Sequence, residues 1–338
     1  MSASVAITLL FADGGTRRVE ANPGDTVVAA AAEAGLNLLT DCSNGQCGTC
    51  TAQLVCGSIE LGDYDRAVLP DADRADGATL CCVSRVTAED CVIELPYDLS
   101  EATAEEPPPI EGTVSAIERV ALETMRLEVC VDAPVTFQPG QYVRLRAAGS
   151  AAWRSYSMAN ASGDSTLVFY VRLVDGGAFS SWIAQSAAVG ATLELSEPRG
   201  SFFLRQEPRP RLFVAGGTGL APFLSMLEAI ASREGAAMQP TTLLLGVRSG
   251  AHLFALERIE QLKQRLPALE VRLAAEAEPG DACHGGYATD LIGTLALDPA
   301  TRIYLCGPPP MVEAVSAYIR EQGIAPVNFY YEKFAASA

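Results

Sequence analysis

The chain has 338 residues, 49 % of them hydrophobic, which is enough for two or three domains that each bury a core. Its 41 acidic side chains outnumber the 24 basic ones, giving a formal net charge of −17. Such acidity argues against nucleic acid as a partner, because phosphate backbones are bound by basic patches. Residues 1–30 show no signal peptide, and the longest uncharged run, Leu212–Leu227, is shorter than the ~18 residues of a membrane span. We therefore predict a cytoplasmic protein that does not enter a membrane.

The acidic charge is concentrated near the N-terminus, where residues 1–98 contain 15 acidic and 5 basic side chains. A strongly acidic domain is steered towards a basic surface on a partner. The alternative is that these charges form only a solvated surface, and the sequence leaves both interpretations open.

Residues 1–98 predict a small fold that opens with a β-hairpin. Alternating apolar residues in Ala3–Phe11 and the segment Thr16–Ala21 are joined by the turn Asp13–Gly15. The next elements expected are a helix over Val27–Ala34 capped by Asp25 or Thr26 and ended by Gly35, a strand near Gln53–Glu60 and a last strand at Cys91–Leu95. That order is typical of the β-grasp fold of plant-type ferredoxins.

A cysteine loop lies between that helix and the following strand. Cys42, Cys47 and Cys50 have the C-x4-C-x2-C spacing of a plant-type [2Fe–2S] site, whose fourth thiolate comes from far downstream. Gly45 and Gly48 supply the positive-φ positions that such a tight loop needs. Zinc is the alternative, but zinc sites usually combine two close cysteine pairs rather than a triplet and a distant partner.

The fourth ligand has two candidates, Cys81 and Cys82. On an extended segment their side chains point to opposite sides, so only one faces the cluster. Ferredoxins place an apolar residue before the ligand and commonly valine after it, and by this resemblance Leu80–Val83 favours Cys82 as the metal ligand. The other cysteines show no disulfide-like pairing, which together with a labile cluster indicates a reducing compartment; they are Cys56, Cys81, Cys91, Cys130, Cys283 and Cys306.

Residues 99–109 are acidic and end in three prolines, a composition that predicts a semi-rigid linker. From residue 110 to about 206, short strands separated by turns predict a small antiparallel barrel.

Residues 207–338 alternate between strand-like and helical patterns, which predicts a parallel sheet with helices on both faces. The expected strands are Arg211–Ala215, Thr241–Val247, Val271–Ala275, Arg302–Cys306 and Val327–Tyr331. The expected helices are Pro222–Ser232, Leu256–Arg265 and Met311–Gln322.

Within the barrel, Arg154–Ser157 (RSYS) resembles the R-x-Y-S/T motif that binds flavin in the ferredoxin–NADP reductase superfamily. The resemblance implies that Arg154 meets a phosphate, Tyr156 packs against the isoalloxazine and Ser157 forms a hydrogen bond near flavin N5. An Arg-x-Tyr on a strand is otherwise ordinary surface and core.

Two further features support a flavin. Tyr170 and Arg172 belong to a strand that leads to Gly176–Ser180, where the family more often has Met in place of Phe179. Gly176 and Gly177 let backbone amides approach a pyrophosphate, and Ser180 lies at a predicted helix start, where anions are favoured. We therefore predict FAD.

The parallel-sheet domain carries two elements that predict a nicotinamide dinucleotide. The first follows a strand and opens a helix, as phosphate-binding turns do; its residues are Gly216, Gly217, Thr218 and Gly219. The second, Cys306, Gly307 and Pro308, ends another strand, where ligands of open α/β sheets bind, and in the superfamily it faces the nicotinamide. Tight packing, and for Cys306 plain burial, are the alternatives.

The segment Asn328–Phe334 also resembles the superfamily, in which Glu332 would organise the contact between flavin and nicotinamide and Phe334 would shield the ring. An aromatic edge strand is the alternative. The expected catalytic residues are thus Ser157, Cys306 and Glu332. Hydride transfer depends on alignment more than on acid–base chemistry, so the lack of a histidine triad is no obstacle.

Taken together, the motifs resemble the reductase components of benzoate, toluate and anthranilate dioxygenases, most closely in Gly216–Pro222, Tyr304–Val315 and Gly323–Phe334. The resemblance implies a β-grasp [2Fe–2S] ferredoxin over 1–98, an antiparallel FAD-binding β-barrel over 110–206 and an α/β parallel-sheet NAD-binding domain over 207–338. Electrons would pass from NADH to FAD, to the cluster and to a separate Rieske-type oxygenase that acts on an aromatic acid. A flavin is needed because a hydride carries two electrons and the cluster accepts one.

Two other functions remain possible from the sequence. A reductase of this kind also serves di-iron monooxygenases such as phenol hydroxylase, and a zinc-stabilised binding protein with a degenerate flavin fold would not be an enzyme. NADH rather than NADPH is implied by the resemblance, although Arg248 stands where a basic residue meets a 2′-phosphate. A solvated loop arginine is the other interpretation of Arg248.

Overall fold

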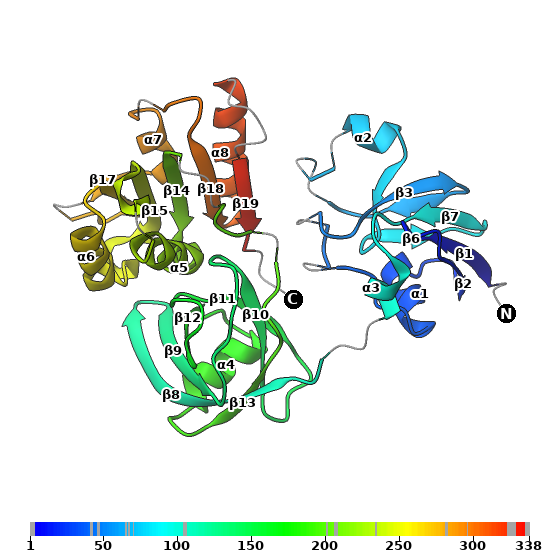
Figure 1. Cartoon of the computed structure of the whole chain (residues 1–338), viewed down its shortest axis with the longest axis horizontal. Helices are drawn as coiled ribbons and strands as arrows, with labels where there is room; N and C mark the ends of the chain where they lie inside the picture. Colours follow the sequence, from blue (N-terminus) through cyan, green and yellow to red (C-terminus); the bar gives the residue numbers. More distant parts are fainter. Residues whose placement is uncertain are drawn as a thin grey trace. The chain divides into compact units, whose positions relative to one another are not determined.

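The computed structural model describes residues 4–40, 43–45, 48–64, 66, 68–69, 71–103, 107–200, 202–205, 209–233, 235–280, 283–295, 297–322 and 329–334. The chain forms two compact units, Met1–Glu106 and Pro107–Ala338. Figure 1 shows a mixed sheet in the first unit, and a barrel and a parallel sheet in the second. The predicted fold class is confirmed in all three parts.

The first unit is built on a five-stranded sheet in the order β2-β1-β7-β3-β5. Its strands are β1 (Val5–Leu10), β2 (Thr16–Ala21), β3 (Thr51–Cys56), β5 (Ala78–Leu80) and β7 (Cys91–Glu94). β1 pairs antiparallel with β2 and parallel with β7, the mixed pattern of a β-grasp sheet. Helix α1 (Val27–Glu33) begins at Thr26, whose hydroxyl accepts a hydrogen bond from the Ala29 N–H at 3.2 Å, as the capping pattern predicts.

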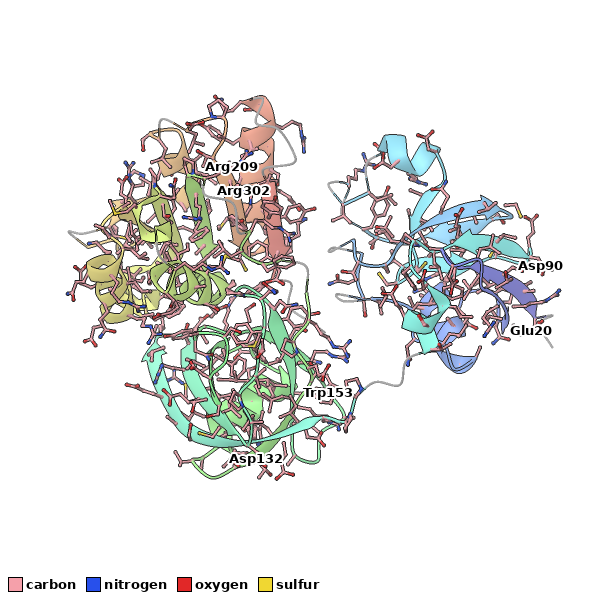
Figure 2. All side chains as sticks on the ribbon, viewed as in Figure 1. Glu20, Asp90, Asp132, Trp153, Arg209 and Arg302 are labelled. Carbon is pink, nitrogen blue, oxygen red and sulfur yellow. The ribbon has the colours of Figure 1, made fainter. Side chains whose placement is uncertain are left out.

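The outer edge of this unit is acidic and open to solvent. Glu20 and Asp90 lie there (Figure 2), and Arg18 contacts their carboxylates at 3.7 and 4.0 Å. All three side chains are more than 60 % exposed, so these ion pairs contribute little stability.

Two local features of the first unit differ from the sequence prediction. The single strand expected near Gln53–Glu60 is split at Gly57, which has a φ of +86°. A Cβ at Gly57 would lie 2.3 Å from the Asp90 carbonyl oxygen, so only glycine fits there. The chain continues as β4 (Ile59–Leu61), which pairs with β6 (Ser84–Val86), and a short helix α2 (Asp71–Ala75) follows.

The structure also differs from the sequence prediction at the start of the expected linker. Leu99–Thr103 forms helix α3, whose Ala102 is 0 % exposed within the core of the first unit. The Asn37 N–H donates to the Ala102 carbonyl at 2.8 Å. Composition suggested a linker from residue 99 because acidic residues and prolines dominate the segment, but Leu99 and Ala102 pack this turn on the core of the first unit. The domain boundaries stay a prediction.

The second unit contains an antiparallel sheet in the order β11-β10-β13-β8-β9-β12. Its strands are β8 (Ile110–Ala121), β9 (Thr124–Val131), β10 (Tyr142–Ala147), β11 (Arg154–Ser157), β12 (Thr166–Arg172) and β13 (Thr192–Leu195). The Ala159 N–H donates to the Val168 carbonyl at 2.9 Å and thereby links the end of β11 to β12. Helix α4 (Ala178–Gln185) contributes Phe179 and Ile183 to the core of this barrel.

The other sheet of this unit has the order β17-β16-β15-β14-β18-β19, with every pair parallel. Its strands are β14 (Arg211–Gly216), β15 (Thr241–Ser249), β16 (Leu269–Ala277), β17 (His284–Gly285), β18 (Arg302–Gly307) and β19 (Phe329–Lys333). Its main helices are α5 (Leu220–Ala231), α6 (Leu256–Arg265), α7 (Ala288–Ile292) and α8 (Pro309–Glu321).

The central strand β14 is buried on both faces, as a parallel sheet requires. Phe213 and Ala215 pack with α5 and α6, whereas Leu212 and Val214 pack with α7 and α8. The α5 face is continuous with barrel residues such as Tyr170, so the barrel and the parallel sheet share one core. Among the described residues no helix is both long and apolar enough to span a bilayer.

Candidate functional site

Three residues that the sequence singled out converge where the barrel meets the parallel sheet. The Glu332 carboxylate accepts a hydrogen bond from the Ser157 hydroxyl at 3.4 Å, and the Cys306 sulfur lies 3.9 Å from the same carboxylate oxygen. Ser157 is 175 residues away from Glu332 in the sequence, and Cys306 is 26 residues away. The fold therefore brings all three expected catalytic side chains to one place.

The strand register explains this convergence. Cys306 on β18 pairs with Ala215 of the central strand on one side and with Glu332 of β19 on the other. Beyond it, the Phe334 N–H donates to the Gly307 carbonyl at 2.9 Å, which fixes the backbone at the carboxyl end of β19. The carboxyl ends of these strands form the edge of the sheet where ligands of α/β folds bind.

The Cys306 thiol is held in its neutral form. It is fully buried, and burial together with the nearby Glu332 carboxylate raises its pKa well above the ordinary value of 9.0. A protonated thiol donates to a carboxylate, whereas a thiolate would be repelled by it. Cys306 is thus a neutral donor at physiological pH and not a nucleophile.

Tyr156 lies next to Ser157 on β11 and packs on aromatic neighbours. Its ring is 5.1 Å from that of Phe179, which in turn is 5.3 Å from Trp182. Burial raises the pKa of the Tyr156 hydroxyl, so this side chain remains uncharged. The phenylalanine that stands in place of the more usual methionine therefore supports Tyr156.

The loop expected to meet a pyrophosphate has the conformation that glycine allows. Gly176 has a φ of +74°, and no heavy atom lies within 4 Å of its Cβ position, so the backbone is open to an approaching group. The Ser180 hydroxyl donates to the carbonyls of Val174 and Gly177 at 2.9 and 3.2 Å, and thus holds the loop against the first turn of α4. Its contacts are therefore within the loop itself.

Tyr170 and Arg172 lie on β12 and make contacts that do not involve Ser157. The Tyr170 ring is 4.7 Å from that of Phe254, and Arg172 Nε is 3.7 Å from the Glu123 carboxylate. Tyr170 belongs to the same hydrophobic core as Cys306, and the roles of Tyr170 and Arg172 as flavin contacts stay predictions. Arg154, on the same strand as Ser157, donates to the Trp153 carbonyl at 2.9 Å.

The glycine-rich turn lies directly against the Cys306 segment. A Cβ on Gly219 would stand 2.2 Å from the Cys306 carbonyl oxygen, and one on Gly216 would stand 2.7 Å from Pro308 Cδ. Gly217 is different: its φ is +53° and no heavy atom lies within 4 Å of its Cβ position. Gly216 and Gly219 therefore permit close packing. Gly217 presents open backbone, with Thr218 beside it in a 3₁₀ turn before α5.

These features fit a flavin and a nicotinamide dinucleotide. Open glycine backbone occurs at both predicted phosphate positions, and one of them precedes the N-terminus of the 12-residue helix α5. The group formed by Ser157, Cys306 and Glu332 combines two neutral side chains with one carboxylate, a setting suited to aligning an uncharged ring.

The first unit contains the cysteine loop. The Cys82 N–H donates to the Cys50 sulfur at 3.4 Å, and the two residues are 7 % and 4 % exposed. Gly45 and Gly48 have φ values of +75° and +79°, so the need for glycine at both positions is confirmed. Cys42 and Cys47 lie outside the described residues.

Cys81 differs from Cys82 in its surroundings. Residues 81–83 form a turn rather than the extended segment that the sequence suggested, because the Val83 N–H donates to the Leu80 carbonyl at 3.0 Å. Cys81 is 1 % exposed, and burial raises the pKa of its thiol to about 12. It therefore behaves as a neutral core residue. The Ser84 hydroxyl donates to the Leu80 carbonyl at 2.8 Å and steadies the turn.

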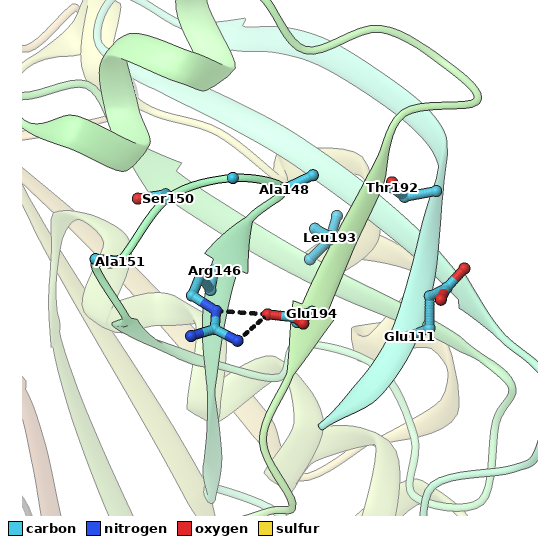
Figure 3. Close-up of a pocket in the computed structure, with 9 residues that line it drawn as sticks. Glu111, Arg146, Ala148, Ser150, Ala151, Thr192, Leu193 and Glu194 are labelled. Carbon is cyan, nitrogen blue, oxygen red and sulfur yellow. Dashed lines mark hydrogen bonds and ion pairs between the residues drawn. The ribbon is translucent and has the colours of Figure 1, made fainter. Parts of the chain in front are cut away.

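One open pocket of about 560 Å³ lies elsewhere on the barrel, between β8, β10 and β13 (Figure 3). Arg146 and Glu194 form an ion pair across it, beside Glu111 and Ser150. None of the predicted site residues lines this pocket, and its arginine is already paired with Glu194.

Sequence reasoning singled out Arg248 but missed the polar residues that surround it. Arg248 forms an ion pair with Glu123 on the β8–β9 turn, and Arg248 Nη2 is 3.1 Å from His252 Nε2. Glu123 and Arg248 are 125 residues apart, so no local pattern could connect them.

Comparison with known proteins agrees with this geometry. Three family models match in chain order: a 2Fe-2S iron-sulfur cluster binding domain over residues 10–87, an oxidoreductase FAD-binding domain over 111–204 and an oxidoreductase NAD-binding domain over 213–317. The toluate 1,2-dioxygenase electron transfer component of Pseudomonas putida is 40 % identical over 97 % of this chain and 98 % of its own length. The chain belongs to the family of dioxygenase electron transfer components.

Other relatives of this reductase family span the whole chain as well. The anthranilate 1,2-dioxygenase electron transfer component of Acinetobacter baylyi is 35 % identical over 98 % of both chains. A crystal structure of a cytochrome P450 reductase from Amycolatopsis is 30 % identical, with a TM-score of 0.73 over 99 % of this chain and 100 % of the other. The reductase is thus an oxidoreductase with domains for a [2Fe–2S] cluster, FAD and a nicotinamide nucleotide.

Proposed function

We propose that this reductase passes electrons from NADH through FAD and its [2Fe–2S] cluster to a separate Rieske-type oxygenase that hydroxylates an aromatic acid. The observation that carries the proposal is the meeting of Ser157, Cys306 and Glu332 at the carboxyl ends of β18 and β19. The toluate dioxygenase relative supports the choice of an aromatic acid system.

The chain's own residues prepare the electron-entry site. Ser157 and Cys306 both donate towards Glu332, which fixes the orientation of the carboxylate next to a neutral thiol. The side chain of Cys306 is itself completely buried, so its contact with Glu332 is shielded from water. When bound, FAD takes up an electron pair as hydride and releases electrons singly. The side chains therefore align the two rings rather than move protons.

In the first unit, Cys42, Cys47, Cys50 and Cys82 would hold the cluster. The hydrogen bond from the Cys82 N–H to the Cys50 sulfur supports this assignment, because it directs a backbone donor at one of these sulfurs. Hydrogen bonds of this kind stabilise negative charge on sulfur and tune the reduction potential of a cluster. A cluster of this type, together with free thiols, is stable in a reducing compartment, from which we infer the cytoplasm.

The test separates electron entry from electron exit. Cys82→Ser should abolish the reduction of cytochrome c, which takes electrons from the cluster, while NADH-driven reduction of ferricyanide at the flavin is retained. Cys81→Ser is the matched control, because the buried, neutral thiol of Cys81 indicates that Cys81 belongs to the core and does not bind the cluster. Cys81→Ser should retain both activities and the visible iron–sulfur spectrum.

Loss of both activities in Cys82→Ser would contradict this division of labour. Loss of the cluster spectrum in Cys81→Ser but not in Cys82→Ser would identify Cys81 as the fourth ligand. Capture of the terminal oxygenase by the tagged reductase identifies the partner, and a di-iron hydroxylase in place of a Rieske protein would replace the proposed acceptor.

A further inference from the structure

A group of polar side chains gathers where the β8–β9 turn meets the carboxyl end of β15. The Glu123 carboxylate pairs with Arg248 and lies 3.7 Å from Arg172 Nε. Arg248 Nη2 is 3.1 Å from His252 Nε2, and the other ring nitrogen of His252 is 2.8 Å from the Ser249 hydroxyl. One carboxylate from the barrel thus faces two guanidinium groups, one of which also contacts an imidazole.

Backbone hydrogen bonds hold Glu123 in this position. The Leu122 N–H donates to the Ala251 carbonyl at 3.0 Å, which joins the turn to the segment after β15. The Leu173 N–H donates to the Glu123 carbonyl at 2.8 Å, which joins the turn to the end of β12. The side chains of Glu123 and Arg248 are nevertheless 35 % and 52 % exposed, so a ligand can reach them.

The strand order indicates which part of a dinucleotide would reach this group. β14 lies between β15 and β18, and the glycine-rich turn that follows β14 is expected to bind the pyrophosphate. The nicotinamide belongs on the β18 side, with Cys306 and Glu332. The adenosine half must therefore extend to the opposite side, across the carboxyl end of β15, where Arg248 is the penultimate residue.

We propose that Glu123 makes this reductase select NADH over NADPH, an inference that rests on the proposed function. An arginine next to the adenosine ribose ordinarily accommodates a 2′-phosphate. Here the Glu123 carboxylate pairs with that arginine and adds a negative charge that repels a second anion. The 2′-hydroxyl of NADH carries no charge, and a carboxylate accepts its hydrogen bond.

The test compares three variants of the holoenzyme in ferricyanide reduction with NADH and with NADPH. Glu123→Gln should raise kcat/KM for NADPH about tenfold, the effect of one charge-assisted hydrogen bond, and change the value for NADH less. Adding Arg248→Ala to this variant should remove the gain. Glu118→Gln takes the same charge from an exposed position of the same hairpin and should leave the NADH to NADPH ratio unchanged.

A binding measurement gives a second readout that does not depend on turnover. Calorimetric titration with 2′,5′-ADP should show tighter binding to Glu123→Gln than to the native enzyme, and no such gain when Arg248 is also replaced. If Glu123→Gln fails to retain FAD, Glu123→Ser is measured against the same criteria.

An unchanged nucleotide ratio in Glu123→Gln, or an equal gain in Glu118→Gln, would overturn the role of Glu123; so would a native enzyme that prefers NADPH. A native enzyme that reduces ferricyanide with neither nucleotide would instead contradict the proposed function.

Discussion

Cys306 illustrates how a single buried residue obtains its chemistry from its neighbours. The same side chain on an exposed loop would titrate near its ordinary value, but here burial and the Glu332 carboxylate both disfavour the thiolate. Because the thiol stays protonated, it remains a donor to Glu332 over the whole physiological range. This residue therefore links the geometry of the electron-entry site to the stability of the fold.

The contribution of Cys306 to the unfolding free energy should depend measurably on pH. Below pH 9 both the folded and the unfolded state carry the proton, so the contribution of Cys306 to stability is complete. Above pH 9 the unfolded state releases the proton while the folded state keeps it, so the unfolding free energy falls by about 1.4 kcal/mol per pH unit. Serine does not ionise, so the Cys306→Ser variant should not show this fall in unfolding free energy above pH 9.

The measurement is urea unfolding at pH 8, 9 and 10, followed by tryptophan fluorescence. Both tryptophans, Trp153 and Trp182, lie in the second unit, so the signal reports the part of the chain that contains Cys306. Other ionising groups are shared by the two proteins and cancel in the comparison. Equal pH slopes for the two proteins would contradict the prediction.

At the scale of elements, the glycine-rich turn combines closely packed and open backbone within four residues. Gly219 approaches the backbone of β18, whereas Gly217 faces open space. The two positions therefore respond differently to the same substitution, although both lie in one 3₁₀ turn.

Gly219→Ala should destabilise the second unit by about 3 kcal/mol, because its Cβ would stand 2.2 Å from a carbonyl oxygen of a central strand that has no room to retreat. Gly217→Ala has space for its Cβ and incurs only the cost of a positive φ, about 1 kcal/mol. Urea unfolding by tryptophan fluorescence compares the two. A larger loss in Gly217→Ala would contradict the packing described for Gly219.

Elements with strong local signals could be predicted from the sequence. Helix α1 follows from the Thr26 cap and the Gly35 terminator, and α6 occupies the predicted range Leu256–Arg265. Elements of about five residues, such as α3 and α7, show too little periodicity to stand out and are fixed by tertiary packing.

The candidate site likewise contains residues that the sequence could predict and contacts that it could not. Ser157, Cys306 and Glu332 were found by motif, and the structure supplied their distances. The contact between Glu123 and Arg248 joins segments 125 residues apart and had no signal in the chain. Nor could the sequence show that the Ser180 hydroxyl is directed at its own loop.

At the scale of the whole molecule, the distribution of charge matters more than its sum. Residues 1–98, which include the cysteine loop, hold 15 acidic and 5 basic side chains, whereas the remaining residues are more balanced. Long-range steering by such a charge depends on ionic strength, because the Debye length falls from about 30 Å at 0.01 M to about 8 Å at 0.15 M salt.

We therefore expect salt to affect the two acceptors differently. Raising the ionic strength from about 0.01 to 0.15 M should slow the reduction of the basic protein cytochrome c several-fold, because screening removes its attraction to the acidic unit. Reduction of ferricyanide, an anion, should not slow. Initial rates at saturating NADH measure both effects, and a parallel decrease for both acceptors would show that salt acts on the flavin half instead.

Under the proposed function, strand β19 also determines when electron transfer can begin during synthesis. A ribosome completes the cysteine loop, Ser157 and the glycine-rich turn well before it adds Glu332, which follows Ser157 by 175 residues. An unfinished chain thus lacks the carboxylate that we propose aligns the two rings. Electrons should therefore enter only after β19 has been added, when the cysteine-loop unit has already been synthesised.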